Sequence, residues 1–403
     1  MRPFEGVKIL DFTWLGVGPL TVNYLNYYGA TTIKVESALR PDPFRISTPY
    51  KEGKIGPETS YGFHHAHPTK AMCVTLNMKH PKAKEIAERL IQWADIVMDN
   101  FTPGTMEKWG LGYEDLKKIK PGIIMMRTCM HGQTGPLARQ PGLGFVLTAI
   151  SGLAPITGWP DRPPSGQYFA FTDFVAPLFN AVCLMAALDY RRRTGKGQCL
   201  DMAQHESVLR CVGPLLLDSV VNRREPTPKG NRLDYAAPHG IYRCKGEDRW
   251  CAIAVFTDEE WKSLCRVIGN PAWTNEPKFN TLLGRKKNED ELDRLVEEWT
   301  SQHSAEEVMA LMQAAGVGAG LAANIKDVVE NPQLKHYGCY QALEHPYMGK
   351  VPIYNPPGFN LSKAPHERAS PPVLGEHNEY VYTKILGLAD EEFVQLMGEG
   401  VFD

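Results

Sequence analysis

The chain has 403 residues, of which 43% are hydrophobic and 22% charged, and its 44 Lys and Arg against 46 Asp and Glu leave a net charge of −2. These proportions are ordinary for a soluble globular protein, and at roughly 150 residues per domain they suggest two or three domains. They exclude disorder, collagen and coiled coil, and they provide no overall basic field that would hold nucleic acid or an anionic membrane.

Cysteine usage and apolar segments bear on where the protein works. None of the nine cysteines forms a CxxC pair, and their odd number favours reduced thiols over a disulfide framework or a zinc site. The N-terminal residues lack the basic segment and apolar run of a signal peptide. The apolar stretch near 174–188 contains Pro and Asn, is bordered by Asp173, and is too short to span a bilayer. We therefore expect a cytoplasmic protein with no membrane partner and no nucleic-acid partner.

The first 130 residues alternate strand and helix patterns. Apolar residues recur at helical spacing in 81–93, and residues 20–28 can also form a helix. Strands separated by such helices predict an α/β fold with a parallel, doubly wound sheet. The predicted strands, which are short β-branched or apolar runs, lie at 7–12, 31–36, 73–76, 94–98 and 121–127.

The second half of the chain predicts a long helix, a linker and a smaller α+β domain. Residues 174–193 are rich in Ala and Leu and end in three arginines, which favours a buried helix with a basic C-terminus. Residues 222–238 are polar and rich in Pro, Arg and Asn, which indicates a linker. The other predicted elements are a hairpin at 240–255, a helix at 258–268, two amphipathic helices within 285–315 and a helix at 376–386.

Glycines follow the first predicted strand. Gly16 and Gly18 open a helix, and Glu36 ends the next strand 20 residues after Gly16, a spacing that fits a dinucleotide site. Such a site needs a third glycine where this chain has Thr21, and Pro19 removes one helix N–H that would bind pyrophosphate. We therefore favour a tight turn in a βαβ unit, with Glu36 as a solvated strand end.

Three histidines, His64, His65 and His67, lie within four residues of one another. Metal sites usually draw ligands from separate elements and add a carboxylate or a thiolate, and the sequence shows no matching cluster elsewhere. We therefore expect no metal site, and we interpret these side chains as loop histidines near an anionic ligand.

Asp173 is the principal candidate for chemistry. It lies in an otherwise almost wholly apolar stretch, 169–177, directly before the long predicted helix. Burying an unpaired carboxylate is costly, so such a residue either caps a helix or takes part in a reaction. The pattern alone favours an N-cap aspartate.

Several segments together resemble the class III CoA-transferases. The match extends from about residue 4 to residue 395, and the order and spacing of the segments make it specific. The segments that carry it are DFTWLGVGP, YYGATTIKVE, ADIVMDNFTPGTMEKWGLGYEDL, HGQTGP, the isolated Asp173, ALDYRRRTGKGQ, APHGIYRCKGEDRW and LGEHNEYVYTKILGL.

The resemblance implies a domain layout and a quaternary structure. A Rossmann-like, CoA-binding large domain is expected to combine residues 1–221 with a return segment at 326–403. A linker at 222–239 and a small α+β domain at 240–325 are expected between them. Members of this family form dimers of ring-shaped chains that interlock, so we expect a homodimer, or a heterodimer with a related chain.

The resemblance also implies a mechanism in which Asp173 is the nucleophile. The carboxylate attacks the thioester carbonyl of an acyl-CoA, which gives a mixed anhydride and a free CoA thiolate. The thiolate then forms an aspartyl-CoA thioester, and the acceptor acid enters by the reverse steps. Aspartate suits this role because it is ionised at neutral pH and needs no general base. An acyl-CoA thioester is then a substrate, and no permanently bound cofactor is expected.

Further positions are carried over from the family as CoA-binding residues. Lys108 corresponds to a basic residue near the CoA phosphates, and Arg40 lies near a position that can stack on adenine. Pro177 departs from the family, which commonly has Gly there, but proline fits the first turn of a helix. The full set of expected CoA-binding residues is Trp14, Gly16, Arg40, Lys70, Asn100, Phe101, Lys108 and His131.

Two other functions remain open on the sequence. The α-methylacyl-CoA racemases are similar in fold, but they use a His-Asp pair where this chain has Leu143 and Gly144, and Leu143 cannot act as a base. The chain is alternatively a non-catalytic, CoA-binding subunit of a heteromeric transferase, although Asp173 argues against that. Segments of this chain resemble those of transferases that act on aromatic or dicarboxylic acids such as benzylsuccinate. The resemblance therefore implies such an acid as acceptor, with succinyl-CoA as donor.

Overall fold

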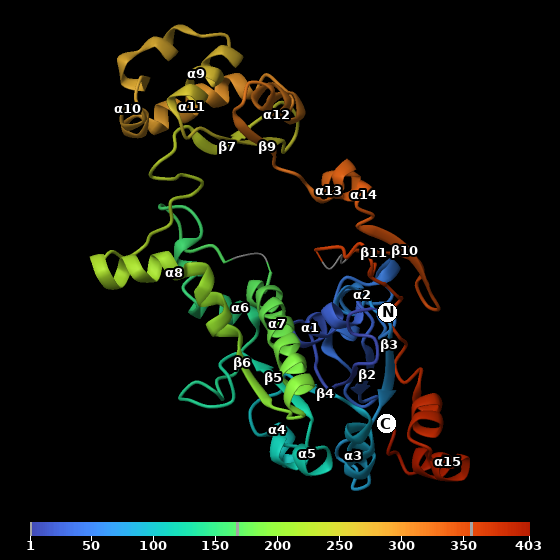
Figure 1. Cartoon of the computed structure of the whole chain (residues 1–403). Helices are drawn as coiled ribbons and strands as arrows, with labels where there is room; N and C mark the ends of the chain where they lie inside the picture. The colour runs from blue at the N-terminus through green and yellow to red at the C-terminus, as the bar shows by residue number, and fades with distance from the viewer. Residues whose placement is uncertain (1, 167–168, 355–357) are drawn as a thin grey trace. The chain divides into compact units, whose positions relative to one another are not determined.

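The computed structural model describes residues 2–166, 169–354 and 358–403 (Figure 1). The chain divides into two compact units. Unit 1 comprises Met1–Ala154, Gly166–Glu225 and Gly338–Asp403, and unit 2 comprises Pro155–Ser165 and Pro226–Tyr337.

Unit 1 is built on a parallel sheet of six strands. The strands lie in the order β3-β2-β1-β4-β5-β6, and every neighbouring pair is parallel. This finding confirms the predicted α/β fold with a parallel sheet. The strands are β1 (Lys8–Asp11), β2 (Thr31–Glu36), β3 (Ala71–Thr75), β4 (Ile96–Asp99), β5 (Ile124–Cys129) and β6 (Cys199–Ala203).

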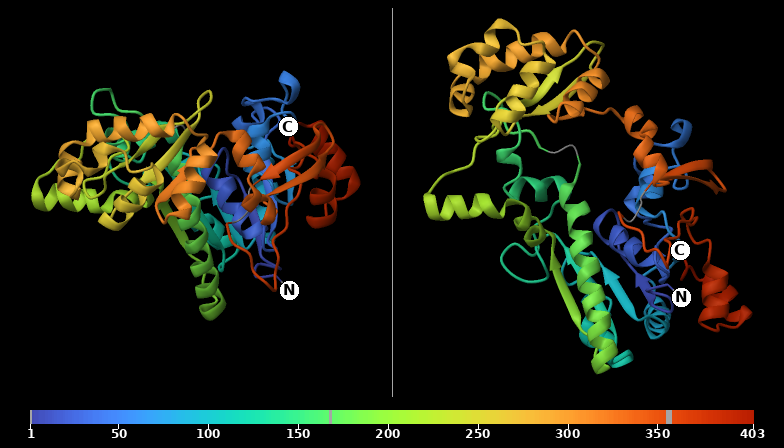
Figure 2. Two further views of the ribbon diagram at one scale, coloured as in Figure 1. Left: turned by 90° about the horizontal axis from the view of Figure 1, so that it is seen from above. Right: turned by 45° about the horizontal axis from the view of Figure 1, so that its top comes forward.

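Alternating apolar residues give the sheet two buried faces. Ile9 points to one face and Leu10 to the other, as successive residues of a strand must. Helices α1 (Val17–Asn26) and α7 (Phe171–Thr194) lie side by side over the Ile9 face (Figure 2). The Leu10 face is covered by α3 (Ala83–Trp93), α5 (Tyr113–Ile119), the π-helical turn Tyr380–Ile385 and α15 (Asp390–Gly398).

The remaining elements of unit 1 surround the sheet. A two-stranded antiparallel hairpin joins β10 (Tyr340–His345) to β11 (Gly349–Tyr354). The other helices are α2 (Tyr61–Ala66), α4 (Thr105–Lys108), α6 (Gly144–Ile150) and α8 (Gln204–Asn222).

Unit 2 has its own core around an antiparallel sheet in the order β7-β8-β9. Capping boxes at Thr257 and Ser304 begin α9 and α12, because each pairs with a glutamate three residues later. The strands are β7 (His239–Arg243), β8 (Trp250–Ala254) and β9 (Gly318–Leu321). The helices are α9 (Asp258–Val267), α10 (Leu282–Lys287), α11 (Glu289–Thr300), α12 (Ala305–Ala314), α13 (Ile325–Glu330) and α14 (Pro332–His336).

Helix α7 is longer than the sequence pattern indicated. It has 24 residues, so the expectation that this stretch is too short to span a bilayer is wrong. Among the described helices, α7 is the one that is long and apolar enough to cross a membrane by length and composition alone. Its buried residues Ala181, Leu184 and Ala187 pack against the sheet core, as those of a core helix do.

Candidate functional site

The site lies at the carboxyl ends of β1 and β4, where the strand order of the sheet reverses. Ligands of open α/β sheets bind in the crevice at such a point. The loops that follow the two strands are tied together, because Trp14 N–H donates to Asn100 Oδ1 at 2.9 Å and Asn100 Nδ2 donates to the Trp14 carbonyl at 2.7 Å. Trp14 also packs edge-on against Phe101, with ring centroids 5.5 Å apart.

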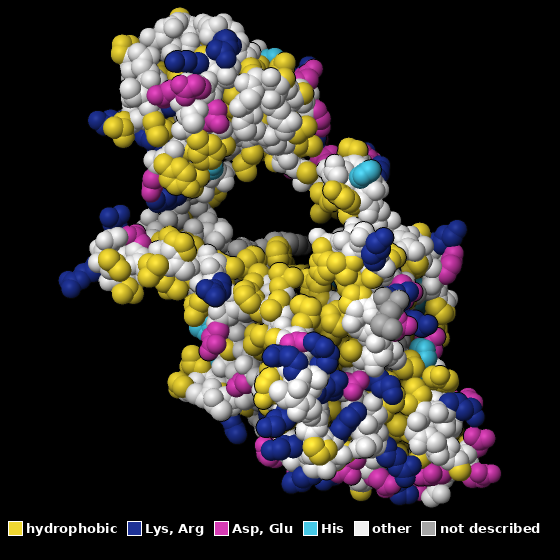
Figure 3. Space-filling model, in the orientation of Figure 1, with side chains coloured by type: hydrophobic (Ala, Val, Ile, Leu, Met, Phe, Trp, Pro, Cys, Tyr) yellow, Lys and Arg dark blue, Asp and Glu magenta, His cyan; other side chains and the backbone are white. Residues whose placement is uncertain are grey.

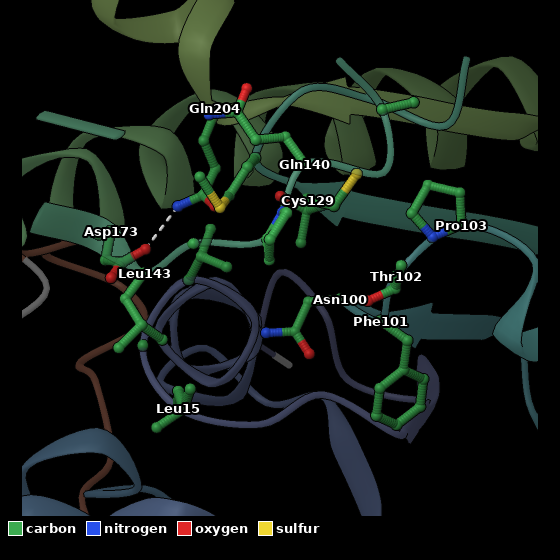
Figure 4. A pocket seen from close by; sticks show the side chains of 18 residues that line it. Leu15, Asn100, Phe101, Thr102, Pro103, Cys129, Gln140, Leu143, Asp173 and Gln204 are labelled. Atoms are coloured by element: carbon green, nitrogen blue, oxygen red, sulfur yellow. Dashed lines mark hydrogen bonds between the residues drawn. The ribbon is translucent and has the colours of Figure 1, made fainter. Parts of the chain in front are cut away.

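A cavity of about 170 Å³ opens beside this pair of loops (Figure 4). Its walls come from the loops after β1, β4 and β5 and from the beginnings of α7 and α8. The lining residues used below are Leu15, Gly16, Asn100, Phe101, Leu143, Gly144, Asp173 and Gln204.

Asp173 enters the cavity from the first turn of α7. The helix begins at Phe171 after Ala170, so the interpretation of Asp173 as an N-cap is wrong. Its backbone N–H bonds to the Ala170 carbonyl at 2.9 Å, and its carboxylate points away from the helix end toward α8. Pro177 correspondingly lies in the second turn, not the first, and it has no N–H to donate to the Asp173 carbonyl.

Among the residues that the structure describes, the carboxylate of Asp173 has one hydrogen-bond donor and no neighbouring cation. Gln204 Nε2 donates to Asp173 Oδ1 at 2.5 Å (Figure 4). Burial raises the pKa of Asp173, and this hydrogen bond lowers it in part. Within the described residues, Asp173 forms no ion pair with Lys, Arg or His. The group is therefore a carboxylate whose negative charge is only weakly stabilised.

Two glycines stand against the other side of this carboxylate. A Cβ at Gly144 would lie 2.6 Å from Asp173 Oδ2 and 2.2 Å from the Ala170 Cβ. A Cβ at Gly16 would lie 3.1 Å from the Asp173 Cβ and 3.6 Å from Oδ2. A side chain at either position would crowd Oδ2, so the glycines leave this oxygen open to the cavity.

A buried charged network fixes the loop that carries Gly16. Leu15 has φ of +61°, and its N–H donates to both carboxylate oxygens of Asp42 at 3.2 Å. Lys34 Nζ lies 3.5 Å from Asp42 Oδ2 and donates to the Thr13 carbonyl at 2.7 Å. These buried bonds hold a strained backbone in place beside the cavity.

Glu36 belongs to the same buried region, so the expectation of a solvated strand end is wrong. Arg45 Nη2 donates to Glu36 Oε1 at 2.9 Å, and both side chains are fully buried. Burial alone would raise the pKa of Glu36, but Arg45 and Lys34 outweigh it and lower that pKa. Arg45 also lies 3.6 Å from the Phe63 ring centroid.

Five of the eight residues expected to bind CoA lie in or beside this cavity. Gly16, Asn100 and Phe101 line it, and Trp14 adjoins it through its bonds to Asn100. The Arg40 guanidinium lies 5.2 Å from the Trp14 ring centroid, so it stacks on this tryptophan.

The other three expected residues lie outside the lining. Lys108 is exposed at the end of α4, and Lys70 is exposed just before the edge strand β3. His131 follows β5 and packs edge-on against His205 at 5.4 Å, and burial lowers its pKa. The pattern did not predict Gln204, although it directly follows β6 at the same edge of the sheet as Asn100 after β4.

The histidine cluster is helical rather than part of a loop. His64 and His65 lie on α2, and His67 ends it. His64 and His67 are buried, and burial lowers the pKa of His64 to about 3. In the described part of the chain, no group of three or more His, Cys, Asp or Glu side chains could hold a metal ion.

Among the described residues that line the cavity, Asp173 is the one carboxylate, and there is no histidine or lysine. Leu143 lies beside Asp173 (Figure 4), and Gly144 stands against Asp173 Oδ2. A carboxylate with no base beside it suits covalent catalysis at an acyl group more than proton exchange at a carbon acid.

Comparison with known proteins identifies the class. The family model for CoA-transferase family III matches residues 4–378. A succinyl-CoA–D-citramalate CoA-transferase of Chloroflexus aurantiacus is 30% identical over 99% of this chain and 98% of its own length. The β subunit of a succinyl-CoA–L-malate CoA-transferase from the same organism is also 30% identical, over 99% and 98%.

A solved structure gives the same result. The crystal structure of a CAIB/BAIF family protein from Brucella suis covers 95% of this chain and 99% of its own, with a TM-score of 0.87 and 28% identity. The chain therefore belongs to CoA-transferase family III, and the prediction of an enzyme of this class is confirmed.

Proposed function

We propose that this enzyme moves CoA from succinyl-CoA to a carboxylic acid through covalent intermediates on Asp173. The observation that carries the proposal is the Asp173 carboxylate in the cavity, with Oδ2 open and no cation to quench its charge. A weakly stabilised carboxylate is the more reactive nucleophile.

The proposed reaction begins and ends with a free Asp173 carboxylate. Asp173 Oδ2 attacks the thioester carbonyl and expels the CoA thiolate, which leaves a mixed anhydride. The thiolate attacks Cγ of Asp173 and expels the donor acid, which gives an aspartyl-CoA thioester. The acceptor carboxylate attacks that thioester and expels the CoA thiolate, which gives a second mixed anhydride. The thiolate then attacks the acceptor carbonyl of this anhydride, forms the acceptor-CoA thioester and releases the Asp173 carboxylate. Each bond broken is replaced by one of similar energy, so no ATP is consumed.

The proposed acceptor is a dicarboxylic acid. The relatives named above are a citramalate and an L-malate transferase, and both of those acids are dicarboxylic. An aromatic acceptor such as benzylsuccinate, which also carries two carboxylates, stays a prediction. Trp14, Arg40, Asn100 and Phe101 are proposed to hold CoA beside Asp173. Lys70, Lys108 and His131 are proposed to act farther along it.

The active form is proposed to be an interlocked dimer in the cytoplasm. Large apolar side chains are exposed along α7, and Figure 3 shows hydrophobic side chains gathered on the face that carries α7 and α8. A partner chain would cover such a surface. The exposed apolar residues of α7 are Phe174, Leu178, Val182 and Met185.

A second candidate is a subunit of a heteromeric transferase. One of the relatives is itself named a β subunit. In that case the chain binds CoA and needs an unlike partner for turnover.

The test is to mix the protein with succinyl-CoA, trap with hydroxylamine or borohydride, and map the modified peptide by mass spectrometry. We expect the modification on Asp173 and its absence in Asp173→Asn. Asp189→Asn is the matched control, because Asp189 lies on the same helix but is paired with Arg192 at the surface. Unmodified Asp173 in a protein that still binds CoA would contradict the nucleophile and favour the heteromeric subunit.

A further inference from the structure

The two oxygens of Asp173 lie in different surroundings. Oδ1 accepts the amide N–H of Gln204 at 2.5 Å. Oδ2 faces Gly16 and Gly144, whose missing side chains leave it open. The carboxylate is thus held in one orientation, with one oxygen bound and the other free to react.

The bound oxygen has a distinct part in the proposed reaction, on which this inference rests. Once Oδ2 has formed the anhydride, Oδ1 is the carbonyl oxygen on Cγ. When the CoA thiolate attacks Cγ, the C–S bond forms and the carbonyl electron pair moves onto Oδ1. Collapse of this tetrahedral intermediate restores the carbonyl and breaks the bond from Cγ to Oδ2. The donor acid leaves as its carboxylate, and no proton is transferred.

Gln204 is well placed to stabilise that charge. Its side chain is buried, and it follows β6 directly, where Ala203 pairs with Cys129 of β5. Ser207 Oγ donates to the Gln204 carbonyl at 2.7 Å, which fixes the first turn of α8. A donor that already points at this oxygen needs little reorganisation when negative charge appears on it.

We propose that Gln204 is a catalytic residue, the oxyanion donor for the tetrahedral intermediates formed at Cγ of Asp173. It therefore accelerates the step from anhydride to thioester and its reverse, while the first attack of Oδ2 on the acyl-CoA places its negative charge on a different oxygen. The two steps separate this role from a merely structural one.

The experiment compares Gln204→Met with wild type at pH 8 in single turnovers with succinyl-CoA. Rapid acid quenching and intact-protein mass spectrometry distinguish the succinyl adduct of the anhydride from the CoA adduct of the thioester. We expect formation of the CoA adduct to slow by about 10²- to 10³-fold, the usual cost of losing one oxyanion donor. The succinyl adduct should form at close to the wild-type rate and accumulate.

A second variant keeps the result independent of packing. Gln204→Glu is nearly the same shape but places a carboxylate against the developing oxyanion, so it should be slower than Gln204→Met in the second step. A purely space-filling role predicts the opposite order. Gln395→Met, at an exposed glutamine of α15, is the matched control and should behave as wild type.

The outcomes separate this inference from the proposed function. A wild-type protein that is never modified at Asp173 would overturn the proposed function itself. A modified wild type with a CoA adduct that forms equally fast in Gln204→Met would overturn only the role of Gln204. Equal slowing of both steps would likewise contradict it, because a distorted site slows the two alike.

Discussion

Unit 1 buries two carboxylates in opposite ways. Glu36 is matched by the Arg45 guanidinium, and the pKa of Glu36 is lowered. Asp173 is matched only by the neutral amide of Gln204, and the pKa of Asp173 is raised. The first arrangement stabilises charge and the second leaves it reactive.

The contrast shows that the buried ion pairs hold the structure around the cavity, whereas the carboxylate without a cation is the candidate nucleophile. Glu36, paired with Arg45, and Asp42, beside Lys34, hold the loop that carries Leu15. Asp173, which has no such cation, lies against Gly16 of the same loop. The cations Arg45 and Lys34 stabilise the buried loop and do not pair with Asp173. A cation beside Asp173 would lower the reactivity of its carboxylate.

The largest loss of stability is expected when the ion pair between Arg45 and Glu36 is broken. Arg45→Met removes the guanidinium that pairs with the buried Glu36 and leaves Lys34 as the nearby cation, so the free energy of unfolding should fall by about 3–5 kcal/mol. Urea denaturation followed by circular dichroism measures this loss. The double variant Arg45→Met with Glu36→Gln should recover a large part of it.

The surface pair of Arg89 and Glu85 provides the control for that variant. Its charges are exposed, at 2.8 Å, so Arg89→Met should cost less than about 1 kcal/mol. If Arg45→Met cost no more than Arg89→Met, the idea that the buried frame depends on charge compensation would be wrong.

A smaller loss of stability is expected when the buried His64 gains a proton. His64 is buried, its Nδ1 has no hydrogen-bond partner, and its folded-state pKa is about 3, below the unfolded value near 6.5. The unfolded state therefore binds more protons between these values, and stability is lost as pH falls below about 6.5. At pH 5 the loss due to this group is about 2 kcal/mol relative to pH 8.

The variant His64→Phe isolates the contribution of His64 to this loss of stability. It keeps an aromatic ring but cannot be protonated, so its stability should fall less between pH 8 and pH 5 than that of wild type. Urea titrations at both pH values provide the comparison. Equal losses in the two proteins would show that another group carries the acid sensitivity.

The smallest change in stability is expected at Asp173. Here substitution should stabilise the fold rather than destabilise it. The folded-state pKa of Asp173 is raised, so its ionised form costs stability above that pKa and the cost disappears as pH falls. Asp173→Asn should therefore abolish transfer while raising the free energy of unfolding at pH 7 by about 1 kcal/mol or less. Thermal unfolding at pH 7 and at pH 4 measures the gain, which should shrink at the lower pH. A clear loss of stability at pH 7 would break the contrast with Glu36.

Much of the sheet could be predicted because its strands are locally encoded. The runs at 31–36 and 96–98 are β-branched or apolar and bounded by turns, so their period of two is visible in the sequence. Strand β6 was missed because Cys199–Ala203 alternates exposed and half-buried residues and lies at the edge of the sheet. The hairpin of β10 and β11 was also missed, since Pro352 lies within its second strand.

The site shows the same division between local and long-range signals. Asp173 stood out because an acid in an apolar stretch is conspicuous in any sequence. Glu36 was misjudged because its partner Arg45 reaches it only through the fold, and Gln204 is 31 residues from the carboxylate it binds. A polar residue directly after a parallel strand is the signal that could have found Gln204, whereas Asn100, at the same position after β4, was expected from the family resemblance.

The C-terminal segment closes the far face of the sheet, and this sets an order on synthesis. Tyr382 Oη donates to the Thr75 carbonyl at 2.8 Å, Thr75 Oγ1 donates to the Phe402 carbonyl at 2.6 Å, and Asn77 N–H donates to the Val401 carbonyl at 2.8 Å. Phe402 lies 327 residues after Thr75 in the chain, so most of the sheet is synthesised before these bonds can form. Until then the part of the apolar sheet face that Tyr382 and Phe402 cover stays exposed on the growing chain, which favours association with other chains.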